Sequence, residues 1–172
     1  MKLDAKFDPK DLDRIKRALA AVNPQARGNI VFKAIQIGSL YLEEKLRKYD
    51  SFSSLGKVFQ GLTKSIGSKV TQQGKLIIGV IGSGASPFAG RVPYATIHET
   101  GGNITVTPKM RGFAFWQYKI TKNPMWIGIA NSSVVKIKAS HYMSKTLNAN
   151  ESAAIKKVVG VIDDELRKVL SK

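Results

Sequence analysis

His98 and Glu99 are adjacent residues whose types could serve a zinc hydrolase. Such enzymes place two histidines one helical turn apart, with a glutamate between them as the base. The matching position here is Gly102, and the only other histidine is His141. A metal-dependent hydrolase built on His98, Glu99 and His141 is therefore one hypothesis, but a structural histidine is the simpler interpretation, and we expect no metal site.

Other catalytic chemistries find little support in the sequence. The chain has no cysteine, and Glu99 is the lone acid between Ser51 and Asn150, which disfavours thiol chemistry and paired carboxylates. Gly79, Gly82 and Gly84 follow an apolar run, but Pro87 stands where a dinucleotide-binding loop needs its third glycine. We expect no catalytic residue and no cofactor, and therefore a protein that is not an enzyme.

Positive charge is concentrated in the middle of the chain. The formal net charge is +16, and the stretch from Ser51 to Asn150 holds twelve Lys or Arg against one acid. Such a segment suits an acidic protein surface or nucleic acid. The candidate basic interaction surface comprises Lys57, Lys64, Lys69, Lys75, Arg91, Lys109, Arg111, Lys119, Lys136 and Lys138. A basic nucleic-acid-binding module is the alternative function.

Aromatic residues accompany this charge. Phe113, Phe115 and Trp116 lie beside Lys109 and Arg111, a mixture that can stack on single-stranded nucleic acid. The residues from Met110 to Trp116 also fit a strand, in which Phe113 and Phe115 would share a face and pack into the core. We favour packing over stacking.

Helical spacing of apolar residues marks both ends of the chain. Asp8-Pro9 predicts the start of a helix that runs to Ala21, and Asn23-Pro24 ends it. A second, longer helix follows through Tyr49, then a weaker helix or connector from Leu55 to Ile66. The last helix occupies residues 151–170, where Ile155, Val158, Ile162 and Leu166 form one apolar stripe.

Strand patterns fill the region between. The predicted strands are residues 76–81, 104–107, 110–116 and 134–138, with residues 126–130 as another possibility, and Pro93 to Thr100 suits a short helix. This order predicts an α+β fold in which a mostly antiparallel sheet of about four strands carries the C-terminal helix. We expect a single domain over 1–172, with N-terminal helices in 1–50, the sheet region in 75–138 and the C-terminal helix in 151–170. No signal peptide or membrane span is expected, so synthesis is expected in the cytoplasm.

The segment from Tyr94 to Gly102 reads YATIHETGG and is followed by Ile104. It resembles a motif of the phage virion-morphogenesis and tail-completion (head-tail joining) proteins, whose motif residues here are Tyr94, His98, Glu99, Gly101 and Gly102. The resemblance extends from about Leu76 to Leu170 and includes the basic strand 134–138 and Tyr142 before the final helix. One departure is Ser140-His141, where the family typically carries Arg-Pro.

This resemblance implies a structural protein of the virion, located in the tail or neck and made in the host cytoplasm. It implies a homo-oligomeric ring that contacts other tail or neck proteins, with possible non-specific contact with DNA. The motif also has a mechanical interpretation. Gly101-Gly102 would allow a sharp turn from a short helix into a strand, and Tyr94 and His98 would pack or hydrogen-bond one helical turn apart.

Overall fold

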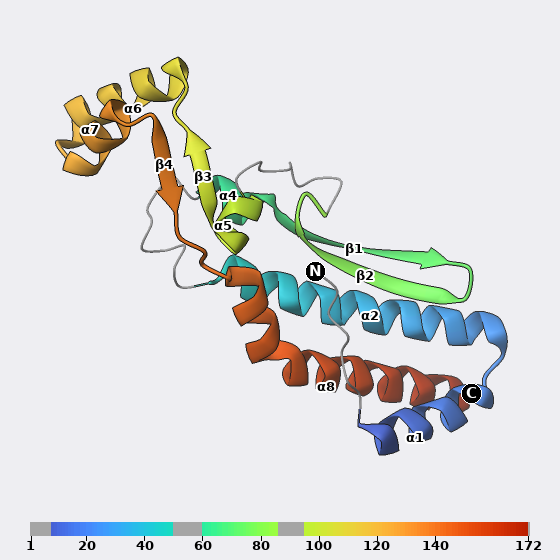
Figure 1. Ribbon diagram of the computed structural model, residues 1–172. Coiled ribbons are helices and arrows are strands. Elements are labelled where there is room, and N and C mark those ends of the chain that lie inside the picture. Colours follow the sequence, from blue (N-terminus) through green and yellow to red (C-terminus); the bar gives the residue numbers. More distant parts are fainter. Residues whose placement is uncertain (1–7, 50–59, 86–94, 172) are drawn as a thin grey trace. The chain divides into compact units, whose positions relative to one another are not determined.

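A computed structural model describes residues 8–49, 60–85 and 95–171 (Figure 1). Packing divides the chain into two compact units. Unit 1 comprises Met1–Val92 and Tyr142–Lys172, and unit 2 comprises Pro93–His141. Unit 2 is therefore an insertion between two parts of unit 1, and each unit is described by itself.

Unit 1 is a helical pair with a β-ribbon. Its described elements are α1 (Pro9–Ala20), α2 (Pro24–Arg47), α4 (Gln60–Ser65), β1 (Ile66–Gln73), β2 (Leu76–Ser83) and α8 (Tyr142–Leu170). Figure 1 shows the β1–β2 ribbon lying along α2, with α8 running beside α2 and α1 near the C-terminal end of α8. The strands are antiparallel and pair from Ile66↔Ser83 to Gln73↔Leu76, so Gly74 and Lys75 form the turn. Gly74 has a φ of 60°, which favours glycine.

Unit 2 is a second β-ribbon that carries a helical hairpin. Its elements are α5 (Ala95–Thr100), β3 (Gly102–Thr105), α6 (Pro108–Thr121), α7 (Pro124–Asn131) and β4 (Val134–Ile137). The strands β3 and β4 pair antiparallel, from Gly102↔Ile137 to Thr105↔Val134. Helices α6 and α7 pack together at the end of this ribbon (Figure 1).

Four helices begin with the same local device, a polar N-cap residue followed by proline at the first helical position. Proline fits there because the first turn leaves its backbone N–H groups without intrahelical partners. Each cap side chain accepts a hydrogen bond from a backbone N–H of the first turn. These bonds are Asp8 to Lys10 at 2.8 Å, Asn23 to Ala26 at 2.8 Å, Thr107 to Met110 at 3.3 Å, and Asn123 to Met125 at 2.9 Å.

Helix α2 is the central element of unit 1, because it contacts α8 on one side and the β1–β2 ribbon on the other. Small residues make both approaches close. A Cβ at Gly38 would lie 2.6 Å from the Val158 Cγ2 of α8, and a Cβ at Gly79 of β2 would lie 2.3 Å from the Ser39 Oγ of α2. The buried core joins α1, α2 and α8 through Ile15, Val22, Ile30, Ala34, Val158, Ile162 and Leu166.

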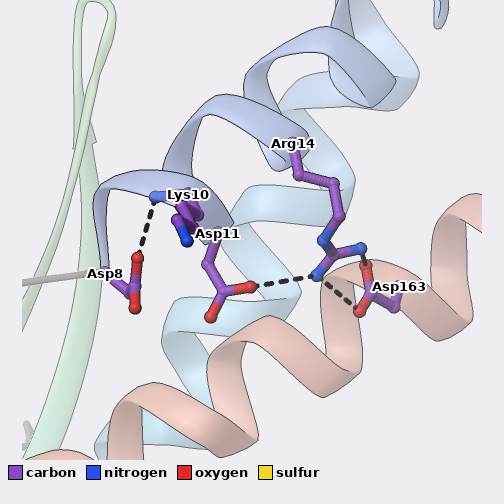
Figure 2. Close-up of polar contacts among 5 residues, drawn as sticks. All are labelled: Asp8, Lys10, Asp11, Arg14 and Asp163. Carbon is purple, nitrogen blue, oxygen red and sulfur yellow. Dashed lines mark hydrogen bonds and ion pairs between the residues drawn. The ribbon is translucent and has the colours of Figure 1, made fainter.

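Ion pairs hold α1 and α2 to α8. The Arg14 guanidinium donates two hydrogen bonds to the Asp163 carboxylate, at 2.7 and 3.0 Å, and lies 3.8 Å from an oxygen of Asp11 (Figure 2). Lys33 and Lys168 both lie 2.8 Å from Oε1 of Glu165. Hydrogen bonds from Lys168 and Lys33 lower the pKa of Glu165 from its ordinary 4.5 to about 2.

The predicted α+β class is confirmed. The strands are antiparallel, and a C-terminal helix follows them in the chain. The four strands are shared between two two-stranded sheets. Helix α8 lies mainly on α2 and reaches the ribbon near its start, where a Cβ at Gly82 would lie 3.2 Å from the Met143 Cε. Helix α8 begins at Tyr142, earlier than the predicted residue 151.

The structure differs from the local expectations at three places. Residues 110–116 and 126–130 lie in helices α6 and α7, because the Thr107-Pro108 and Asn123-Pro124 caps start helices there. The stretch ending at Ile66 is expected to be a weak helix or a connector, but Ile66 starts β1, whose ladder with β2 supplies the backbone hydrogen bonds. The predicted helix from Leu55 lies partly outside the described residues. None of the helices in the described ranges combines the length and apolar character of a membrane span.

We predict that Gly38→Ala destabilises unit 1 by about 1–3 kcal/mol, because the added methyl meets the stiff, β-branched Val158. Urea unfolding followed by far-UV circular dichroism measures the loss. Gly160→Ala on α8 is the matched control, since a Cβ there meets nothing within 4 Å. It should leave stability unchanged or raise it by up to about 1 kcal/mol. Equal effects of the two substitutions would contradict close α2–α8 packing.

We predict that the Glu165 cluster weakens in acid. Its folded pKa of about 2 lies below the ordinary 4.5, so the ionised carboxylate stabilises the folded state at neutral pH. That contribution is lost as the pH falls from 4.5 towards 2. The urea midpoint of Glu165→Gln should therefore approach that of the wild type as the pH falls through this window. Asp13→Asn, outside the Lys33–Glu165–Lys168 cluster, should not show this convergence.

Candidate interaction surface

The His98–Gly102 segment turns the chain from α5 into β3. The backbone N–H of Gly101 donates to the Ile97 carbonyl at 2.7 Å, which satisfies a carbonyl near the C-terminal end of α5. Gly101 has a φ of 77°, and a Cβ there would lie 3.0 Å from the backbone nitrogen of Ala139. Both its conformation and its close neighbour therefore require glycine. Gly102 follows with a φ of 157°, and a Cβ there would lie 3.6 Å from the Ile97 Cγ2.

The end of α5 is fastened to the residues that follow β4. The backbone N–H and the Oγ of Ser140 both donate to the His98 carbonyl, at 2.8 and 2.6 Å. The backbone N–H of His141 donates to the Glu99 carbonyl at 3.2 Å. These bonds satisfy carbonyls that a helix leaves free at its C-terminal end. We call residues 97–102 and 139–141 the latch.

His98 and Glu99 thus contribute through their backbones to the fold of unit 2. Burial lowers the pKa of the His98 imidazole below its ordinary value of 6.5, which favours the neutral ring at neutral pH. Within the described ranges no three His, Cys, Asp or Glu side chains form a group that could hold a metal ion, so His98, Glu99 and His141 form no such group. Tyr94, the remaining motif residue, lies outside the described residues.

The predicted basic residues are distributed over both units. Lys64, Lys69 and Lys75 belong to unit 1, while Lys109, Arg111, Lys119, Lys136 and Lys138 belong to unit 2. All eight are exposed, and Lys57 and Arg91 lie outside the described residues. Of the five in unit 2, three lie on α6 and two lie at the end of β4. Lys122, which caps α6 in a left-handed conformation, is a sixth base that the prediction did not include.

The aromatic residues of α6 are exposed, which corrects the expectation that Phe113 and Phe115 share the core face of a strand. They lie on a helix whose buried residue is Ala114. Phe113 is 49% exposed, Phe115 40% and Trp116 53%. The Phe113 ring contacts Trp116 and, edge to face, Trp126 of α7, with centroids 5.9 and 5.8 Å apart. Core packing therefore does not account for these rings.

No family model, curated protein or solved structure matches this chain.

We predict that the latch stabilises unit 2. Gly101→Ala should cost about 1–3 kcal/mol from backbone strain and the Ala139 contact, and Ser140→Ala about 1 kcal/mol from the lost bond to the His98 carbonyl. Both tryptophans, Trp116 and Trp126, lie in unit 2, so urea unfolding followed by tryptophan fluorescence reports on this unit. Gly112→Ala in α6 meets nothing within 4 Å and serves as the control. Unfolding of Gly101→Ala at the control's midpoint would refute the role of the latch.

Proposed function

We propose that this chain is a structural protein of a tailed phage or phage-like particle, a tail-completion or neck component that joins tail to head. In this role it acts by fitting against other macromolecules and transforms no substrate. It assembles as a homo-oligomeric ring in the virion after synthesis in the host cytoplasm, and contacts other tail or neck proteins.

The observation that carries the proposal is the latch. The His-Glu-Thr-Gly-Gly segment that resembles the tail-completion motif ends a short helix and leads into β3. Its carbonyls are bound by residues that directly follow the basic strand β4 and precede α8. The motif, the basic strand and the final helix follow one another in the same order as in the family that the chain resembles. In this chain the motif fastens the end of α5 to the residues after β4. Ser140 and His141, which replace the family's Arg-Pro pair, supply the hydrogen bonds.

The surface of unit 2 supports a role in contacts with large partners. Exposed apolar residues gather on α6, α7 and the start of β4, where Met110, Phe113, Phe115, Trp116, Ile120, Met125 and Val134 are all more than a third exposed. Exposed basic residues also lie on α6, at its C-cap and on β4. Extended surfaces of this composition are typical of interfaces between macromolecules.

We predict that the purified protein forms a closed oligomer of one defined mass, measured by light scattering after size exclusion and by native mass spectrometry. Deleting the gene in the parent particle should leave heads and tails unjoined in electron micrographs, and a plasmid copy should restore joined particles. A strictly monomeric protein, together with normal particles after deletion, would overturn the proposal.

A further inference from the structure

The segment from β3 to the end of β4 is uniformly cationic. Residues 102–138 contain Lys109, Arg111, Lys119, Lys122, Lys136 and Lys138 and no acidic residue. All six side chains are exposed. Because no carboxylate within this segment balances them, the charge favours a polyanionic partner.

The exposed side of α6 combines this charge with flat rings. Residues three or four apart share one face of a helix, so two adjacent stripes can be defined. Stripe A contains Arg111, Phe115 and Lys119, and stripe B contains Lys109, Phe113, Trp116 and Ile120. Each stripe places at least one ring next to a cation, and Trp116 is more than half exposed.

The alternation of cations and rings indicates which of two polyanions, a lipid surface or a nucleic acid strand, suits this helix. A lipid surface selects helices whose cations and apolar residues lie on separate faces, because headgroups and acyl chains occupy separate layers. A nucleic acid strand alternates phosphates with planar bases along its length, so cations and rings must also alternate. Stripe A of α6 has the second arrangement, with Phe115 between Arg111 and Lys119, and stripe B adds Lys109 beside the rings of Phe113 and Trp116. Duplex bases have both faces covered by their neighbours, whereas an unpaired base can stack on an exposed ring.

We propose that the exposed side of α6 binds single-stranded nucleic acid, with Phe115 and Trp116 stacking on bases and Arg111, Lys119 and Lys109 contacting phosphates. This inference goes beyond tail completion and stands on the surface of unit 2 alone. A chain that forms no ring could still bind a single strand, and a ring could form without binding one, so failure of either proposal is distinguishable.

The binding test uses the full-length protein and fluorescent oligonucleotides of about 20 nucleotides, enough to span one binding site. The probes are oligo-dT, oligo-U and a mixed-sequence duplex, followed by fluorescence anisotropy over a salt series. We expect the single strands to bind more tightly than the duplex at each salt concentration. Oligo-dT and oligo-U distinguish DNA from RNA as the preferred strand.

Substitutions separate stacking from charge. Trp116→Ala and Phe115→Ala should each weaken binding roughly five- to a hundredfold. Leu170→Ala, which removes an exposed apolar side chain from α8 in unit 1, should change binding less than twofold. Arg111→Gln and Lys119→Gln should each reduce the salt slope by about 0.7. Lys156→Gln, at an exposed position of α8 in unit 1, should not.

A spectroscopic readout tests the ring contact directly. Trp126→Phe leaves Trp116 as the only tryptophan and retains an aromatic ring against Phe113. Stacking of a base on Trp116 should quench its fluorescence at saturating oligo-dT. The proposal is overturned if no strand binds at low salt, if the duplex binds as tightly as the single strands, or if Trp116→Ala binds like Leu170→Ala. Binding to vesicles of anionic phosphatidylglycerol in place of either oligonucleotide would also overturn it.

Discussion

The close approach of α2 to its two neighbours is the constraint on which unit 1 depends. Gly38 admits Val158 of α8 on one side, and Ser39 meets Gly79 of β2 on the other. A two-stranded ribbon is marginal alone, and a long helix needs a surface for its apolar stripe. Helix α2 meets both conditions, because it contacts α8 at Gly38 and the β1–β2 ribbon at Ser39. The ion pairs of Arg14 and Glu165 then secure helices that this packing has already brought together.

Much of unit 1 can be predicted from sequence because its signals are local and repeated. The apolar spacing of α8 and the caps at Asp8 and Asn23 agree with the structure. The same cap-proline signal is present at Thr107-Pro108 and Asn123-Pro124, but the β-branched and aromatic residues that follow favour strands by composition. The segments become helices because the caps satisfy backbone N–H groups of the first turn, which strand-favouring side chains do not.

The latch was partly predictable and the exposed rings were not. A sharp turn at Gly101 follows from two consecutive glycines, and its φ of 77° agrees. The partners of His98 and Glu99, by contrast, lie about forty residues further on, and only pairing of β3 with β4 brings them near. The placement of Phe113 and Phe115 depends on whether side chains repeat every two residues, as in a strand, or every 3.6, as in a helix. Assigning residues 110–116 to a strand therefore placed both rings in the core, whereas the helix exposes them.

The pairing of Thr105 with Val134 has a consequence for how such a chain can diversify. The segment between these two residues leaves the ribbon and returns to it at a single strand pair. Just beyond that pair, the backbone N–H of Val106 donates to the Ser133 carbonyl at 2.8 Å. The free energy of closing a connection grows only slowly with its length. Residues 107–132 can therefore be exchanged for shorter or longer excursions without disturbing the register below. The helices α6 and α7 are thus a replaceable insertion on the β3–β4 stem.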